Sequence, residues 1–286
     1  MSLRPDLLGA TSGPVTASWE ADDLLLYALG VGAGQDDPLT GLDLTTENTA
    51  DTPQRALPTY CVLLAQRTPG ARVSYGDVDR SRLVHGEQAV EMHEPLPVAG
   101  SVQLSSRVAG IAQKSTGVVL STETVGTDPR SGRPLFTTRQ SSFLRGMSTP
   151  NTGEDRLAPI PEWRQPPRSP EVTVVTATRP DQALLYRLCG DRNPLHSDPA
   201  YAARAGFDRP ILHGMCTFGI TARTLIAALC DGDPARLKSF GGRFSKPVHP
   251  GGKLSVVAWT DGDRCLFQTR DHLDDVVIDR GVLVLR

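Results

Sequence analysis

The segment 186–219 gathers side chains that can exchange protons on a backbone constrained by glycine and proline. Asp191 and His196 stand five residues apart in the run GDRNPLH, with Asn193 between them. A carboxylate and an imidazole aimed at one point can orient a water molecule and move a proton near neutral pH. The residue types and their spacing therefore indicate acid–base chemistry on water.

The residues around this run must place the two groups on a turn. Residues 181–188 (DQALLYRL) predict a helix from the spacing of their leucines. Gly190 follows where a left-handed helix end is favoured, and Pro194 prevents the helix from resuming. We therefore expect the carboxylate and the imidazole to project from a short, stiff turn and not from one helical face.

The run GDRNPLHSDPAYAARAGFDRPILHG resembles the signature of the R-specific enoyl-CoA hydratases, also called hydratase 2 or MaoC-like dehydratases. The pattern Gly-Asp-x-Asn-Pro-Leu-His-x-Asp-Pro, then Ala-Gly-Phe, then Pro-Ile-Leu-His-Gly, is matched without a gap. The resemblance implies the hot-dog fold, in which an antiparallel sheet wraps a long helix. It also implies two such units in one chain, so the expected fold class is an α+β double hot-dog.

The same resemblance implies a reaction. Enzymes of this family add water across the double bond of a trans-2-enoyl-CoA to give a (3R)-hydroxyacyl-CoA. By the resemblance, Asp191 and His196 are the catalytic pair that orients and activates the water, and which of them takes which proton stays open. Asn193 is expected to fix the turn or the water through its amide. Asp198 precedes a proline and is expected to be a helix N-cap and not a catalytic group.

His213 and Gly214 stand at the expected start of the longest helix, residues 215–230. Backbone N–H groups at a helix N-terminus lack partners inside the helix and can hold an oxyanion. The resemblance and this position together assign the Gly214 amide as donor to the thioester oxygen. His213 is expected to be structural.

The segment 243–252 (RFSKPVHPGG) resembles the family's Arg-Phe-x-x-Pro-Val-x-Pro-Gly segment. Arg243 and Lys246 are candidates for binding the phosphates of coenzyme A, which need charge-assisted donors. The alternative is a solvated basic edge. The family often carries an aromatic residue at the position of His249.

Composition limits the other classes of function. The chain has 286 residues, 39% of them hydrophobic, and a net charge of −2, which argues against a broad surface for nucleic acid or membrane. The five cysteines are scattered without a CxxC pair, so we expect free thiols and neither a disulfide frame nor a metal site. No apolar run reaches membrane-spanning length and no signal-peptide core is present, so a cytoplasmic protein is expected. No cofactor is expected, because coenzyme A is part of the substrate.

The expected domain organisation is an N-terminal hot-dog unit over residues 1–150, a linker over 151–170 and a catalytic hot-dog unit over 171–286. Prolines are concentrated between the two units, which is typical of a linker. In the first unit, strands are expected between residues 83 and 145, a helix over 21–34, and either a strand or a helix over 56–66.

The first half repeats the second but lacks its catalytic run. Tyr27 aligns with Tyr186, and the same register puts Gly32 opposite Asp191. We therefore expect the first half to be non-catalytic and to accommodate the acyl chain.

Three polar residues of the first half resemble a second site only superficially. The Leu-Val-His-Gly at 83–86 echoes Ile-Leu-His-Gly at 211–214, so His85-Gly86 is expected to be a duplicated structural turn. Glu87 is expected at the end of a helix or strand. With no GDxNPxH run beside them, these residues and His93 are not expected to be catalytic.

Three rival functions share this fold or ligand. A thioesterase would hydrolyse the thioester, and a dehydratase would run the reverse reaction on chains carried by acyl carrier protein. A non-enzymatic acyl-CoA-binding subunit would require loss of the catalytic turn, which is intact here. A homodimer is expected, because hot-dog sheets expose edges and faces that commonly pair.

Overall fold

The protein is described by a computed structural model over residues 3–4, 6–79, 82–149 and 163–286. The strands are β1 (Thr11–Trp19), β2 (Leu83–Met92), β3 (Gly100–Lys114), β4 (Gly117–Thr127), β5 (Pro134–Arg145), β6 (Val172–Ala177), β7 (Leu237–Phe244), β8 (Lys253–Asp261), β9 (Arg264–Arg270) and β10 (Val276–Leu285). The α-helices are α1 (Ala21–Gly30), α2 (Leu42–Thr45), α3 (Cys61–Arg67), α4 (Gln182–Tyr186), α5 (Pro199–Arg204) and α6 (Gly214–Leu229). Short 3-10 helices are η1 (Pro58–Tyr60), η3 (Arg187–Cys189), η4 (Pro194–His196) and η5 (Pro234–Arg236).

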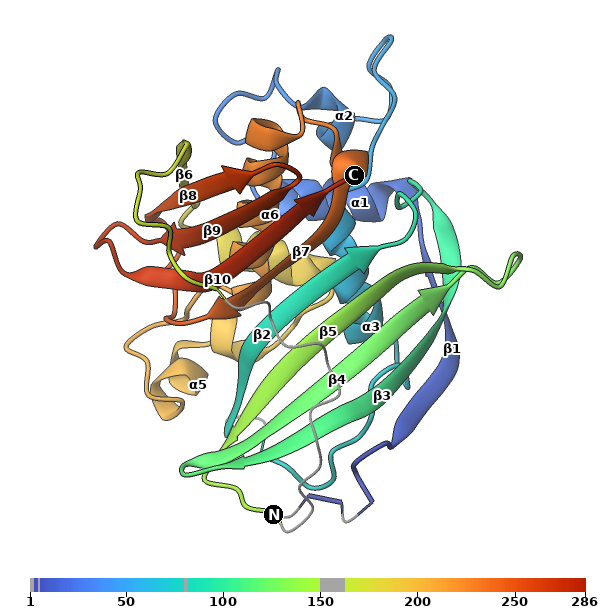
Figure 1. Ribbon diagram of the computed structural model, residues 1–286, viewed down its shortest axis with the longest axis vertical. Coiled ribbons are helices and arrows are strands. Elements are labelled where there is room, and N and C mark those ends of the chain that lie inside the picture. Colours follow the sequence, from blue (N-terminus) through green and yellow to red (C-terminus); the bar gives the residue numbers. More distant parts are fainter. Residues whose placement is uncertain (1–2, 5, 80–81, 150–162) are drawn as a thin grey trace.

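All ten strands form one antiparallel sheet in the order β1-β3-β4-β5-β2-β7-β10-β9-β8-β6 (Figure 1). Read outward from the central β2–β7 pair, the two halves have matching orders, β2-β5-β4-β3-β1 and β7-β10-β9-β8-β6. The halves are therefore structural repeats joined edge to edge. This arrangement confirms the predicted α+β double hot-dog.

Alternation of side chains explains why these segments form strands with one buried face. In β3, Val102, Leu104 and Val108 are fully buried, whereas Ser105 and Arg107 between them are exposed. Successive side chains of a strand point to opposite faces, so one face of β3 packs on the core and the other meets solvent.

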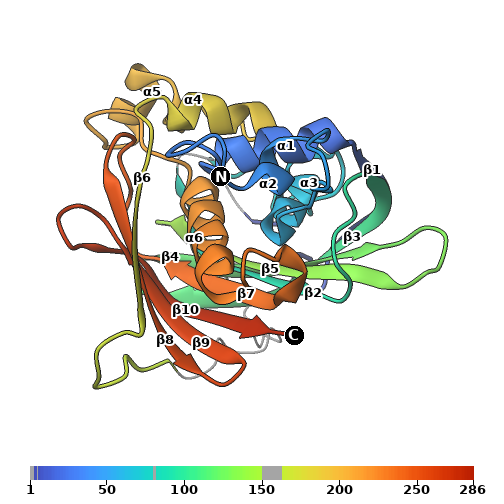
Figure 2. The same ribbon diagram turned by 90° about the horizontal axis from the view of Figure 1, so that it is seen from above.

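Helix α6 is the central helix of the second half and lies across the concave face of the sheet (Figure 2). It is apolar around most of its circumference, as expected of a helix surrounded by protein. Phe218 packs on Phe240 of β7 with ring centroids 4.6 Å apart. Of the predicted core positions, Phe218 and Leu225 are fully buried and Leu229 is partly buried.

The first half has a much shorter central helix. Residues 56–66, for which both a strand and a helix were open, form η1 followed by the seven residues of α3. The 3-10 helix η1, which precedes α3, contacts both α6 and the central strand β2. The α3 helix ends at Arg67, close to the predicted catalytic turn.

Helices α1 and α4 form an outer layer in which the two halves touch (Figure 2). Tyr27 and Tyr186, the residues aligned by the sequence repeat, are both fully buried and their ring centroids lie 6.2 Å apart. The Gln182 side chain donates a 2.6 Å hydrogen bond to the Gly30 carbonyl. The repeat detected at these tyrosines is therefore also a contact between the halves.

The proposed correspondence between residues 83–86 and 211–214 is wrong. His85 and Gly86 lie inside strand β2, whose counterpart in the second half is β7, whereas Gly214 begins helix α6. A four-residue match carries too little information to separate a strand from a helix start. Glu87 likewise lies within β2 and not at the end of an element.

Two further expectations concern the cysteines and the linker. The five cysteines are free thiols, as predicted, and all of them are buried. Residues 151–162 of the predicted linker lie outside the described residues, and the domain boundaries stay a prediction. The ring nitrogen of Trp163 donates to the Gly281 carbonyl at 3.0 Å.

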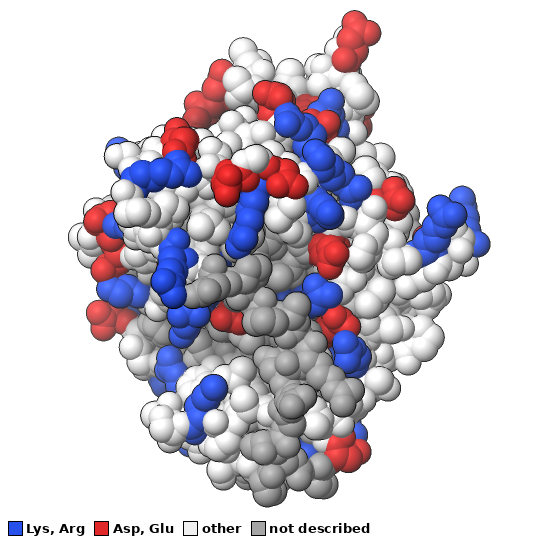
Figure 3. All heavy atoms as spheres, in the orientation of Figure 1, with Lys and Arg blue, Asp and Glu red and all other residues white. Residues whose placement is uncertain are grey.

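Surface charge and helix length bear on whether the protein binds nucleic acid or a membrane. On the face shown in Figure 3, Lys and Arg are interspersed with Asp and Glu, with no broad basic area among the described residues. None of the helices in the described ranges has the length and apolar character needed to cross a membrane.

Candidate active site

The predicted catalytic turn is built from local hydrogen bonds. Gly190 has φ +131°, a conformation that favours glycine, and it ends η3. Asp191 Oδ1 accepts from the Asn193 backbone N–H at 3.2 Å, and Asn193 Oδ1 accepts from the Leu195 N–H at 3.1 Å. The recorded contact of the Asn193 side chain is therefore to the turn itself.

His196 is held with one ring nitrogen occupied and the other available. Its Nδ1 lies 2.8 Å from the Ile211 carbonyl oxygen, which only accepts, so Nδ1 carries the hydrogen. In the neutral ring Nε2 then has a free lone pair. His196 is 8% exposed, and this burial lowers its pKa below the ordinary value. The ring is therefore neutral at pH 7 and suited to take a proton.

His213 contacts both members of the pair. Its ring stacks on His196 with centroids 3.7 Å apart, and its Nε2 lies 3.1 Å from the Asp191 carbonyl oxygen. The Tyr186 ring packs on its other side with centroids 4.9 Å apart. Burial, and then the neighbouring His196, lower the pKa of His213. His213 was expected to be structural, and its position between the two residues allows it to orient both.

Asp191, His196 and His213 converge on a small volume. One potential ligand atom from each, a carboxylate oxygen or a ring nitrogen, lies within 4.8 Å of the others. A single water molecule can therefore reach the carboxylate and an imidazole together. The same spacing would suit a metal ion, and the absence of a metal stays a prediction.

Gly214 is the first residue of α6, after His213 as N-cap. Its N–H falls among the first four of the helix, which lack intrahelical partners. A Cβ atom at Gly214 would lie 3.4 Å from the Phe244 ring, which packs against this helix start. The predicted oxyanion donor thus stands at the positive end of a 16-residue helix.

Two residues of the first half also belong to this site, and the sequence analysis did not identify their role. Gln66 Nε2 donates to Asp191 Oδ2 at 2.8 Å. The His85 ring lies edge-on to Phe244 with centroids 4.9 Å apart, and its Nε2 is buried without a recorded partner in the described residues. Neither residue lies in the catalytic motif. No local signal links them to a turn more than a hundred positions further along the chain.

The candidate coenzyme A residues lie apart from the turn, on and after β7. Arg243 is exposed and pairs in register with Glu87 of β2. Lys246 is about half exposed and forms a 2.6 Å ion pair with Asp275. An exposed pair of this kind contributes little stability, so a phosphate can compete for Lys246. His249, at the position where the family often has an aromatic residue, accepts a 3.3 Å hydrogen bond from Arg209.

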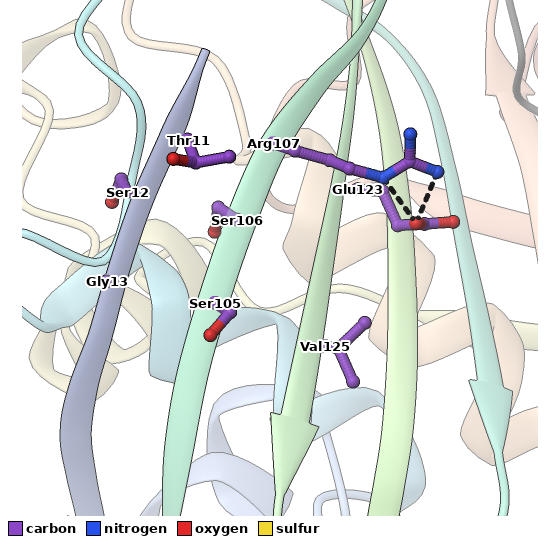
Figure 4. A pocket seen from close by; sticks show the side chains of 8 residues that line it. All are labelled: Thr11, Ser12, Gly13, Ser105, Ser106, Arg107, Glu123 and Val125. Carbon is purple, nitrogen blue, oxygen red and sulfur yellow. Dashed lines mark hydrogen bonds and ion pairs between the residues drawn. The ribbon is translucent and has the colours of Figure 1, made fainter. Parts of the chain in front are cut away.

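Two cavities among the described residues lie away from the predicted catalytic turn. One of about 330 Å³ lies over β1, β3 and β4, beside the ion pair of Arg107 and Glu123 (Figure 4). The other, of about 290 Å³, is lined by Gln54, Arg55, Ala56 and Pro58, by residues 95–98 and by residues 233–235, together with Met92 and Leu237. Neither is lined by the predicted catalytic residues.

We expect Gly190→Ala to destabilise the protein and lower kcat. A Cβ at Gly190 would lie 3.0 Å from the Arg67 Cβ, and φ +131° is unfavourable for alanine. The cost should be about 1–3 kcal/mol in the free energy of unfolding, measured by urea titration. Gly206→Ala is the control, because Gly206 has φ +87° but nothing within 4 Å. Equal losses of stability and kcat in the two variants would contradict the role given to the contact between Gly190 and Arg67.

We expect stability to fall in acid because His85 is buried neutral. Desolvation lowers its pKa from 6.5 to about 4. Between these values the unfolded chain binds a proton that the native state does not, so the free energy of unfolding decreases as pH falls. At pH 5 this contribution reaches about 2 kcal/mol. Urea unfolding at pH 7 and pH 5 should show a smaller pH effect in His85→Leu, and an unchanged one in a variant of the exposed His272.

Comparison with known proteins places this site in a family. The MaoC-like domain matches residues 162–280, and the MFE-2 hydratase 2 N-terminal domain matches residues 18–146. The chain is 40% identical to 3-hydroxyacyl-thioester dehydratase Y of Mycobacterium tuberculosis, covering 99% of this chain and 98% of that protein. It is 41% identical to the enoyl-CoA hydratase ChsH3 of the same organism, covering 93% of each.

A solved structure shares the whole fold. The MaoC-like dehydratase from Phytophthora capsici superposes with a TM-score of 0.87 at 31% identity, covering 100% of this chain and 98% of that one. Similarity of this extent covers both halves of the sheet and the predicted catalytic turn. The chain belongs to the MaoC-like dehydratase and hydratase 2 family.

Proposed function

We propose that the protein adds water reversibly to trans-2-enoyl-CoA thioesters to give (3R)-hydroxyacyl-CoA. The observation that carries this proposal is the convergence of the Asp191 carboxylate and the neutral His196 ring, with a free Nε2, beside the first turn of α6. A hydro-lyase needs a proton acceptor, a water site and donors for the thioester oxygen, and these residues supply all three.

The reaction requires an activated water and a stabilised thioester oxygen, and different groups of the site provide them. The water oxygen forms a bond to C3, the C2–C3 double bond becomes a single bond, and a proton is added at C2. Both hydrogens of the water end in the product, so no oxidant, reductant or cofactor is consumed. Asp191 and His196 hold the water and move its proton. The Gly214 N–H, at the positive end of α6, stabilises the charge that develops on the thioester oxygen.

The partner in this proposal is an acyl-CoA thioester. Arg243 and Lys246, which stand on and just after β7, would bind its phosphates. The non-catalytic first half would give room to the acyl chain. We further propose a cytoplasmic homodimer with no metal or separate cofactor, so that activity survives treatment with a chelator.

The second candidate function is the reverse reaction, dehydration of a 3-hydroxyacyl thioester. It is favoured because one relative is named a thioester dehydratase and the same site catalyses both directions.

The test of the proposed function follows the loss of enoyl-thioester absorbance with crotonyl-CoA, a long-chain enoyl-CoA and a carrier-protein thioester. The product is coupled to R- and S-specific dehydrogenases. Hydration to the R product supports the proposal, and faster reaction of the longer chain supports the role given to the first half. Release of free coenzyme A without hydration would instead identify a thioesterase.

A further inference from the structure

The predicted catalytic carboxylate is hydrogen-bonded from both halves of the molecule. Asp191 Oδ1 accepts from the backbone N–H of Asn193, two residues further along its own turn. Asp191 Oδ2 accepts from Gln66 Nε2 at 2.8 Å, and Gln66 lies in the last turn of α3 in the first half. Each oxygen thus has one recorded donor, and the side-chain donor comes from the half without a catalytic motif.

The end of α3 that carries Gln66 is itself fixed. Arg67 donates to both carboxylate oxygens of Asp23 in α1, at 2.8 and 3.2 Å, and to the Ser18 carbonyl at 2.7 Å. The Arg67 side chain also packs against Gly190, the residue before the catalytic acid. A donor on a restrained helix end loses little conformational freedom when it binds, so the contact to Asp191 can be geometrically selective.

We propose that Gln66 is a positioning residue that sets the orientation of the Asp191 carboxylate for its reaction with water. This inference rests on the proposed hydratase function. The amide N–H donates to one carboxylate oxygen at 2.8 Å and so favours one side-chain rotamer of Asp191. The remaining lone pairs of Asp191 then face the water beside His196. Because an amide does not titrate, the restraint is the same across the working pH range.

The first half therefore contributes more than space for an acyl chain. Its helix α3 is the counterpart of α6. The C-terminal end of α3 and the N-terminal end of α6 both lie beside the predicted catalytic turn. Helix α6 brings the Gly214 N–H by its first residue, and α3 brings the Gln66 amide by its last turn. The repeat without the GDxNPxH run thus supplies a side chain that holds the carboxylate of the other repeat.

The experiment compares Gln66→Met, which keeps the side-chain length without a donor, with Gln66→Glu, which keeps the shape. For Gln66→Met we expect kcat to fall by about 10- to 100-fold, the range for losing a hydrogen bond to a charged group, with KM within about twofold. In Gln66→Glu a protonated carboxyl can still donate to Asp191, whereas an ionised one repels it. Its activity relative to wild type should therefore be higher at pH 5.5 than at pH 8.

Gln54→Met is the matched control. Gln54 is also half-buried in the first half, but its amide donates to the Ala21 carbonyl at 3.0 Å, away from the turn. This variant should keep wild-type kcat. Wild-type kcat in Gln66→Met, or a wild-type pH profile in Gln66→Glu, would overturn the proposal. If Gln66→Met does not fold, the pH profile of Gln66→Glu alone tests the proposal. A wild-type protein without hydratase activity would refute the proposed function instead, since that outcome does not depend on Gln66.

Discussion

His196→Ala should lower kcat/KM for enoyl-CoA hydration by about 10³-fold or more. General acid–base groups typically contribute 10²- to 10⁴-fold, and no other side chain recorded at this turn offers an accessible neutral imidazole with a free nitrogen among the described residues. Asp191→Asn should have a similar effect. It preserves the shape of the side chain but removes the charge and presents an amide to Gln66.

The control for these two variants lies in the same motif. Asp198 caps α5 by accepting from the Ala200 and Tyr201 N–H groups, as predicted from the sequence. Asn is an equally good cap, so Asp198→Asn should retain both stability and activity. Steady-state hydration kinetics and circular dichroism of all three variants would check the prediction. If Asp198→Asn lost as much activity as His196→Ala, the assignment of the catalytic pair would be wrong.

Gly214→Pro should lower kcat by about 10²- to 10³-fold, the usual cost of removing one oxyanion donor. Proline removes the N–H that we assign to the thioester oxygen. It should not unfold the helix, because Gly214 is the first residue of α6 and proline is favoured there. His213 before it has φ −58° and ψ 131°, a conformation that a residue before proline readily adopts.

Gly214→Ala separates the loss of the N–H from the effect of added bulk. The new Cβ would lie 3.4 Å from Phe244, an ordinary van der Waals distance, and the N–H is retained. We expect near-wild-type kcat for alanine and a large loss for proline. A comparable loss in both, measured with crotonyl-CoA as substrate, would mean that space at this position matters and that the amide does not.

Local signals allowed much of the site to be predicted from the sequence. The turn after Gly190, the cap at Asp198 and the start of α6 each depend on residues within a few positions of one another. The correct α+β double hot-dog followed from a motif resemblance. The strands expected between residues 83 and 145 are found as β2 to β5.

Contacts between distant segments could not be predicted in this way. The hydrogen bond from Gln66 to Asp191 depends on how two repeats dock, which no periodicity reports. The false equivalence of residues 83–86 and 211–214 has the same origin. A strand in the middle of the sheet and a helix start share four similar residues, and only the tertiary pairing of β2 with β7 distinguishes them.

The pairing of β2 with β7 has a consequence for how the protein gains activity during folding. These strands join residues 87–91 to residues 239–243, which are far apart in the chain, and contacts of this kind form slowly. The hydrogen bond from Gln66 to Asp191, the proposed catalytic carboxylate, also spans the two repeats, so it forms only after they dock. Recovery of hydratase activity should therefore lag behind recovery of helix and strand signals after dilution from denaturant.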